Sequence, residues 1–163
     1  MRLTHYADYA LRVLLYLAIR PSCLSTIEEI ASAYGISKGH LTKVVNQLSN
    51  LGWVETVRGR SGGLRLATNL GGLTIGAIVR NTENGFALAQ CFSSDSGSTV
   101  CAIDPRCNLK NVFAAARDAF LAELDKFQVV ELAQPANELG GLLNITAPGP
   151  VKLYALVRND TIG

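Results

Sequence analysis

Hydrophobic residues near the start of the chain recur every three or four positions, which is the spacing of an amphipathic helix. The run begins after Thr4, which suits an N-cap, and stops at Pro21, which cannot continue a helix. The pattern therefore predicts a first helix over about residues 4–20. Charged residues interrupt the hydrophobic run, so we expect neither a signal peptide nor a membrane span here.

The next pattern is typical of a helix-turn-helix. Ser25 and Glu28 have the spacing of a capping box and predict a short helix over about residues 26–34. Gly35 suits a tight turn, and Ser37 suits the N-cap of a second helix. Such a pair can be a generic helical hairpin or a DNA-binding motif, and the segment that follows favours DNA binding.

That segment reads WVETVRGRSGGLRLA and predicts a β-hairpin. Its β-prone runs, residues 53–58 and 64–67, flank a glycine-rich connection with Arg58, Arg60 and Arg65 around it. A hairpin directly behind a helix-turn-helix is the wing of a winged helix, and guanidinium forks match phosphate oxygens. An ordinary basic hairpin is the alternative interpretation.

Two further helices are predicted after the hairpin. Thr74 suits the N-cap of a short helix that ends near Asn81, and a long amphipathic helix is predicted over about residues 105–127. Few other elements are available to cover the long hydrophobic stripe, so burial against a second copy predicts a twofold homodimer. Packing of the stripe on the first helix of the same chain is the alternative.

The predicted fold is therefore mainly α with a small β wing. We divide the chain into a winged helix-turn-helix DNA-binding domain at residues 1–82, a cysteine loop at 83–107 and a dimerisation helix at 105–128. Residues 129–163 are expected to form a loosely held tail of unknown role.

The charge distribution supports this division. Residues 1–80 contain nine Lys/Arg against four Asp/Glu, whereas residues 81–163 contain six against nine. The basic half suits a polyanion such as DNA. No run of about 18 apolar residues occurs, so a cytoplasmic protein is expected. Two histidines and no phosphate-binding glycine loop offer little catalytic equipment, so we do not expect an enzyme.

The predicted DNA contacts lie on the second helix of the motif and on the wing. Asn46 or Gln47 could pair with adenine through both atoms of the amide in the major groove. The wing arginines would contact the backbone or minor groove and contribute affinity more than base choice. The full set is Ser37, Lys38, His40, Lys43, Asn46, Gln47, Arg58, Arg60 and Arg65.

Three of the four cysteines, Cys91, Cys101 and Cys107, lie in one Ser- and Gly-rich stretch. In a reducing compartment such clusters are more often metal or redox sites than disulfides. Three thiolates suit zinc or an iron-sulfur cluster about equally, and they leave one of four ligand positions open. Free thiols are a further alternative, and Cys23 is most simply a half-buried small side chain.

The sequences LTHYADYALRVLLYLA and RGRSGGLRLA, followed by three cysteines before a long helix, together resemble the winged-helix iron-sulfur regulators of the IscR/NsrR type. The resemblance covers about residues 1–128. It implies that Cys91, Cys101 and Cys107 bind an iron-sulfur cluster.

Within that family, the IscR type has a histidine ligand where this chain has Lys110. The resemblance is therefore closer to the nitric-oxide-sensing NsrR type, in which an aspartate from the partner subunit's first helix can complete a 4Fe-4S cluster. Asp8 matches that aspartate, although the start of a helix is also a favourable place for any carboxylate.

The resemblance implies a homodimeric repressor that binds an inverted repeat and releases it when nitric oxide damages a 4Fe-4S cluster. A regulator that senses redox or iron-sulfur status through a 2Fe-2S cluster is one alternative. A zinc-bound winged-helix regulator is the other.

Overall fold

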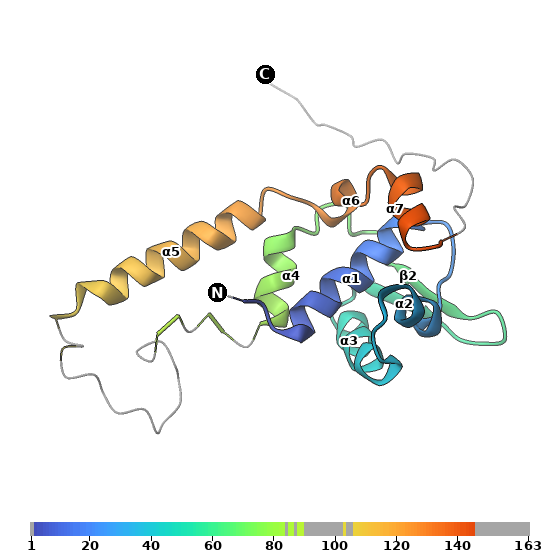
Figure 1. The fold of residues 1–163 in the computed structure, drawn as a ribbon, viewed down its shortest axis with the longest axis horizontal. Helices are drawn as coiled ribbons and strands as arrows, with labels where there is room; N and C mark the ends of the chain where they lie inside the picture. Colours follow the sequence, from blue (N-terminus) through green and yellow to red (C-terminus); the bar gives the residue numbers. More distant parts are fainter. Residues whose placement is uncertain (1, 84, 87, 90–102, 104–105, 146–163) are drawn as a thin grey trace, which may run out of the picture.

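The computed structural model describes residues 2–83, 85–86, 88–89, 103 and 106–145. Helices and a small hairpin follow one another along the chain, and one long helix projects from the rest (Figure 1). The elements are α1 (His5–Ile19), α2 (Ile27–Tyr34), α3 (Lys38–Asn50), β1 (Val54–Val57), β2 (Gly63–Leu66), α4 (Ile75–Thr82), α5 (Asn108–Leu124), α6 (Val129–Leu132) and α7 (Ala136–Leu142).

Helix α1 is the centre of the core. The Thr4 side chain caps it by accepting a hydrogen bond from the Ala7 backbone N–H at 3.2 Å. α1 contacts α3, α4, α6, α7 and β2, so it is enclosed on several sides. Its buried residues are Ala7, Ala10, Val13, Leu14, Tyr16, Leu17, Ala18 and Ile19. The predicted first helix is confirmed to within one residue at each end.

The capping box of α2 lies one residue later than predicted. Thr26 accepts a hydrogen bond from the Glu29 backbone N–H, and Glu29 accepts one from the Thr26 backbone N–H. Ser25 is fully buried and exchanges two backbone hydrogen bonds with Leu64 of β2, at 2.9 and 2.7 Å. This extended pairing holds Ser25 outside the helix, so the prediction of Ser25 and Glu28 as the box was wrong.

The turn between α2 and α3 has the expected chemistry. Gly35 has a φ of 63°, a left-handed conformation that costs glycine little. Ser37 caps α3 by accepting from the His40 backbone N–H. The inner face of α3 is formed by Leu41, Val44, Val45 and Leu48, all buried. The helix-turn-helix is confirmed.

The wing is a two-stranded antiparallel sheet. Val54 lies opposite Leu66, and Val57 lies opposite Gly63. Val54 and Leu64 are buried, so one end of the hairpin is anchored to the core while the turn projects from it (Figure 1). The fold is therefore mainly α with a β wing, as predicted.

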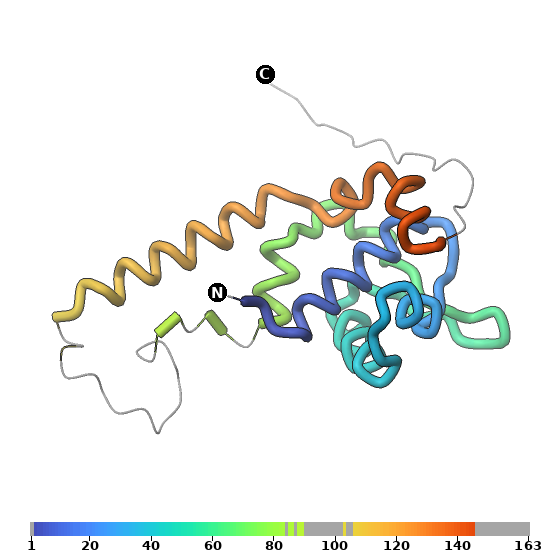
Figure 2. Tube along the Cα trace, in the orientation of Figure 1, coloured from blue at the N-terminus to red at the C-terminus, as the bar shows by residue number. Residues whose placement is uncertain are grey.

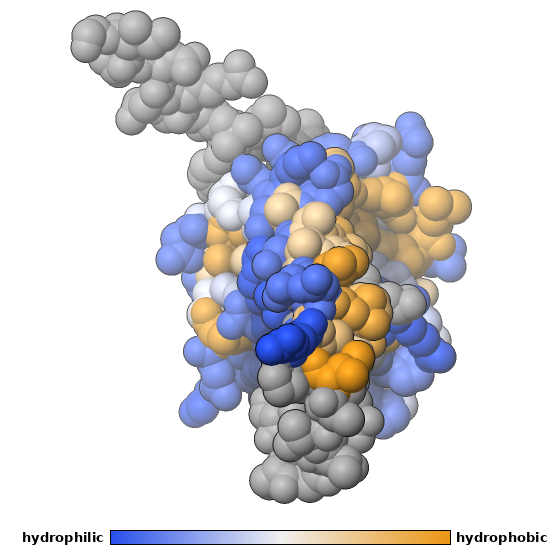
Figure 3. All heavy atoms as spheres, turned by 90° about the vertical axis from the view of Figure 1, so that its left-hand side faces the viewer, coloured by the Kyte–Doolittle hydropathy of each residue, from blue (hydrophilic) through white to orange (hydrophobic). Residues whose placement is uncertain are grey.

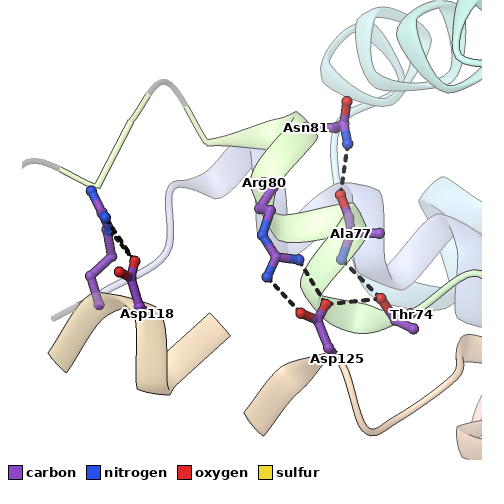
Figure 4. Close-up of polar contacts among 7 residues, drawn as sticks. Thr74, Ala77, Arg80, Asn81, Asp118 and Asp125 are labelled. Carbon is purple, nitrogen blue, oxygen red and sulfur yellow. Dashed lines mark hydrogen bonds and ion pairs between the residues drawn. The ribbon is translucent and has the colours of Figure 1, made fainter. Parts of the chain in front are cut away.

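A polar cluster joins α4 to the end of α5 (Figure 4). Arg80 donates two hydrogen bonds to the Asp125 carboxylate, at 2.7 and 2.6 Å, and the Thr74 hydroxyl donates a third at 3.1 Å. The backbone N–H of Ile75 also donates to the Phe127 carbonyl at 2.9 Å. These contacts fix the direction in which α5 leaves the rest of the fold.

The first part of the predicted tail is ordered, which corrects the expectation of a loosely held segment from residue 129 onward. α6 and α7 return over α1 (Figure 2), and Val129, Ala133 and Ile145 are buried there. Hydrophobic burial therefore extends the core to Ile145. Residues 146–163 lie outside the described residues.

Helix α5 leaves most of its surface uncovered in one chain. It spans Asn108–Leu124, inside the predicted 105–127, and Leu121 is its one buried residue. Leu109 and Val112 are 55% and 60% exposed. Hydrophobic patches are visible on the side from which α5 projects (Figure 3). Among the helices of the described ranges, none combines the length and hydropathy needed to cross a membrane.

Replacement of Gly76 by alanine should loosen the contact between α4 and α5. A Cβ there would meet the Asp125 side chain and would lie 3.0 Å from the Leu121 carbonyl oxygen. We expect Gly76→Ala to lower the free energy of unfolding by about 1–3 kcal/mol in urea titrations, because the backbone of α5 must shift. Gly141→Ala in α7, where nothing lies within 4 Å, is the control and should not destabilise. Equal losses of unfolding free energy in the two variants would contradict the close approach of α4 and α5 at Gly76.

Hydrogen bonds from Arg80 hold the pKa of the Asp125 carboxyl below its ordinary value. A group with a lowered folded-state pKa stabilises the fold above its unfolded pKa, and that contribution disappears as the pH falls through the folded pKa. We expect the difference in Tm between wild type and Asp125→Asn to be constant above about pH 5 and to shrink below about pH 4. A difference independent of pH would show that the ionised carboxylate does not stabilise the junction.

Candidate functional site

The outer face of α3 carries most of the predicted DNA contacts. Ser37, Lys38, His40, Lys43 and Asn46 are all exposed. The buried residues of the same helix face α1, so the exposed positions form one surface at the edge of the domain. This is the arrangement that a recognition helix needs to enter a major groove.

The first turn of α3 is held by local contacts. The Ser37 hydroxyl lies 2.9 Å from His40 Nδ1 and also caps the helix, so the imidazole ring is oriented at the helix start. Lys38 pairs with Glu28 of α2 at 2.5 Å. DNA phosphates would therefore compete with Glu28 for Lys38, whereas His40 is presented without rearrangement of the helix.

Gln47 differs from the other predicted contacts because its side chain turns toward the core. The Tyr6 hydroxyl donates to Gln47 Oε1 at 2.5 Å, and Gln47 Nε2 donates to the Asn81 carbonyl at 3.2 Å. Burial raises the pKa of Tyr6, so its hydroxyl keeps the proton that it donates. The Gln47 amide thus links α1, α3 and α4.

The three wing arginines are not equivalent. Arg58 and Arg60 are exposed in the turn of the hairpin. Arg65 lies on β2 directly opposite Glu55, and its guanidinium pairs with that carboxylate at 2.7 Å. The positive charge available to a phosphate is therefore concentrated in the turn.

Asp8 lies in the first turn of α1, with its side chain 40% exposed. Its Oδ1 accepts a hydrogen bond from Arg12 Nε at 3.0 Å, and the Arg12 guanidinium lies 5.6 Å from the centre of the Tyr34 ring. Among the described residues, the one hydrogen-bond partner of the Asp8 side chain is this neighbour in its own helix, so the partly exposed carboxylate can be reached by a group from outside the chain. A carboxylate oxygen of this kind can act as a hard ligand to a metal ion.

Cys107 occupies the N-cap position of α5 and is half-buried, with no disulfide. A helix N-terminus favours anionic groups, so it suits a thiolate ligand. Cys91 and Cys101 lie outside the described residues. Lys110 lies on the first turn of α5. Of the four predicted cluster ligands, the structure describes Cys107 and Asp8, and a thiolate and a carboxylate are chemically able to bind iron.

Within one chain, the start of α5 stands away from the start of α1 (Figure 1). Cys107 and Asp8 are therefore not brought together by the fold of a single subunit. Among the described residues, no group of three or more metal-ligating side chains is assembled. A site that uses both residues requires a second copy of the chain.

Sequence reasoning missed the residues that connect these surfaces. Tyr6 fits the hydrophobic spacing of the first helix, which gives no sign of its hydrogen bond to Gln47, and the Arg80–Asp125 pair joins residues 45 positions apart. Glu83 accepts hydrogen bonds from the Thr4 backbone N–H and hydroxyl, at 2.7 and 3.0 Å, across a similarly long separation in the chain. No periodic pattern signals such pairs, because they depend on how the helices pack.

Comparison with known proteins identifies a family. A family model described as "Rrf2: Iron-dependent Transcriptional regulator" matches residues 3–135. The chain is 46% identical over 146 residues to the HTH-type transcriptional regulator NsrR of Bacillus subtilis, which covers 89% of this chain and 99% of that protein. It is 42% identical over 146 residues to the protein of the same name from Halalkalibacterium halodurans, with the same coverage.

Solved structures share the fold. CymR (YrzC), the global cysteine regulator of B. subtilis, superposes with a TM-score of 0.65 and 24% identity, covering 82% of this chain and 96% of that chain. T. potens IscR gives a TM-score of 0.66 and 21% identity, covering 85% and 90%. These likenesses support the winged-helix architecture.

The wing arginines should differ in their effect on the salt dependence of DNA binding. The slope of log K against log salt concentration is negative, and removal of one cationic side chain from a DNA phosphate reduces its magnitude by roughly 0.9. We expect Arg58→Ala or Arg60→Ala to reduce this magnitude by about that amount in fluorescence anisotropy titrations. Arg65→Ala should reduce it less, because Glu55 already pairs with Arg65. A larger effect for Arg65 would mean that DNA displaces Glu55.

Proposed function

The chain belongs to the Rrf2 family of iron-dependent transcriptional regulators, and on that premise we propose a homodimeric repressor whose DNA affinity depends on an iron-sulfur cluster that nitric oxide damages. The protein regulates transcription and is not an enzyme. Its near full-length similarity to regulators named NsrR supports the nitric-oxide signal, as does Lys110 at the position of the IscR-type histidine.

The separation of Asp8 from Cys107 in one chain carries the proposal. α5 projects from the DNA-binding domain with Cys107 at its far end and with Leu109 and Val112 exposed beside it. Burial of those side chains against a second α5 would remove apolar area from water, which is favourable at about 25 cal/mol per Å². A twofold pair can thereby place the cysteine loop of one subunit near α1 of the other.

Cys91, Cys101 and Cys107 of one subunit and Asp8 of the partner subunit would hold a 4Fe-4S cluster. When bound, the cluster supplies iron with which nitric oxide reacts. The thiolates are the soft, strong ligands, and the Asp8 carboxylate is the hardest and weakest match. Asp8 is thus the ligand expected to be released first.

Asp8 lies at the start of the helix around which the core is built. While Asp8 is held by the other subunit, the two DNA-binding domains keep one relative position. Once Asp8 is released, α1 is free of the other subunit, and the domains populate arrangements that no longer match two half-sites of an inverted repeat.

The exposed face of α3 would lie in the major groove. His40, Lys43 and Asn46 are its exposed side chains for base and phosphate contacts, and Asn46 has the amide that pairs with adenine. Arg58 and Arg60 in the wing turn would contact the backbone or minor groove.

Removal of the Asp8 carboxylate tests the proposal. We expect wild-type protein purified without oxygen to contain iron, to absorb in the visible region and to bind an inverted-repeat DNA at least tenfold more tightly than the cluster-free protein. Nitric oxide should change the spectrum and release the DNA together. Asp8→Ala should weaken the cluster-loaded complex toward the affinity of the cluster-free protein.

Glu123→Ala is the matched control, because Glu123 is also a carboxylate in a surface ion pair with a residue close to it in the chain. It should leave nitric-oxide sensitivity unchanged. If Asp8→Ala still binds DNA tightly and releases it with nitric oxide, the contact between Asp8 and the partner subunit has no part in the mechanism. Colourless wild-type protein with zinc and no iron would overturn the iron-sulfur assignment, and reversible reduction of a 2Fe-2S spectrum would replace the 4Fe-4S type.

A further inference from the structure

Gln47 lies on the recognition helix but is not presented as a base-reading side chain. Its neighbour Asn46 is exposed, whereas Gln47 is half-buried at the edge where α3 meets α1 and α4. Recognition of adenine through both ends of an amide uses the oxygen and the nitrogen together. In Gln47 both are occupied, by the Tyr6 hydroxyl and by the Asn81 carbonyl. These bonds direct the amide toward α1 and α4, whereas Asn46 is exposed on the outer face of α3.

The partners of Gln47 connect it to the functional end of α1. Tyr6 is two residues before Asp8 in the first helical turn. Thr4, the N-cap of the same turn, is bonded through its N–H and hydroxyl to Glu83 at the end of α4. The start of α1 and the end of α4 are thus fastened to each other, and the Gln47 amide fastens α3 to both.

We propose that Gln47 is a positioning residue that couples the first turn of α1, which carries Asp8, to the recognition helix, and that it does not read DNA bases. This rests on the proposed function, in which Asp8 is held by the partner subunit. A displacement of the α1 turn reaches α3 through Tyr6 and Gln47, because these side chains span the two helices directly.

Open space beside the hydrogen bond between Tyr6 and Gln47 allows this bond to form and break. An open surface pocket of about 210 Å³ is lined by Thr4, Tyr6, Gln47 and Thr82. The Gln47 side chain therefore has room to change rotamer without displacing the buried residues of α3. A side chain with open space beside it can move while the close-packed core keeps its arrangement.

The coupling is measured as the ratio of operator affinities between cluster-loaded and cluster-free protein. One net hydrogen bond corresponds to roughly a two- to tenfold change in an equilibrium constant. We expect Tyr6→Phe and Gln47→Leu each to reduce the ratio by about that factor, and the double variant to reduce it no further. Additive effects would mean that the two residues do not act as one unit, and would overturn the proposal.

Tyr34→Phe is the matched control, because the Tyr34 hydroxyl is buried and has no hydrogen-bond partner among the described residues. The same atom is removed, no hydrogen bond between described residues is lost and the ring beside Arg12 is retained, so the ratio should keep the wild-type value. An equal reduction by Tyr34→Phe would assign the effect of Tyr6→Phe to general loosening of the core and overturn the coupling.

Base preference separates positioning from reading. Affinities of wild type and Gln47→Leu are compared across operators substituted at each position of one half-site. We expect the variant to keep the wild-type order of preference at every position. Loss of discrimination at a single base pair in Gln47→Leu but not in Tyr6→Phe would make Gln47 a reader and overturn the proposal.

A double-mutant cycle in protein prepared without metal tests the contact apart from the cluster. The change in the unfolding constant caused by the double variant should differ from the product of the changes caused by the two single variants by about two- to tenfold. Additivity would show that the contact does not form. If wild type binds DNA equally with and without the cluster, the proposed function fails, whereas this cycle still decides whether Gln47 and Tyr6 interact.

Discussion

The burial of α1 is the constraint on which the rest of the structure depends. Most of its residues from Ala7 to Ile19 are withdrawn from water, and five other elements contact it. Each fully buried aliphatic side chain contributes about 1.5–3 kcal/mol, so a small movement of this helix disturbs a large part of the core. The position of α1 therefore fixes the positions of the recognition helix, the wing and α4 together.

The first turn of this buried helix is the part that a group from outside the chain can contact. Within the described part of the chain Asp8 is bonded to Arg12 of its own helix alone, whereas Thr4 and Tyr6, which precede it, are bonded to Glu83 and Gln47. Those hydrogen bonds lie on the surface of the core, where they can rearrange. A force on the first turn is thus transmitted through polar contacts while the hydrophobic packing below stays intact.

The second connection leads through α5. Arg80, Thr74 and Asp125 fix the end of α5 against α4, and Gly76 allows the two helices to approach closely. Because α5 is one continuous helix that projects from the rest of the fold, this junction determines where Cys107, Leu109 and Val112 are placed. Cys107 and the exposed face of α3 are therefore related through the contacts of α5 with α4 and of α4 with α1.

The sequence by itself determined the local elements and the chemistry. Periodicity and caps such as Thr4, Ser37 and Thr74 predicted the helices, and the wing followed from its glycine-rich arginine turn, because these depend on neighbouring residues. Burial of Ser25 against β2, the ordering of α6 and α7, the inward turn of Gln47 and the Arg80–Asp125 junction depend on contacts between distant segments. Only the tertiary structure decided them, because packing between distant segments stabilises one of several conformations that the local sequence permits.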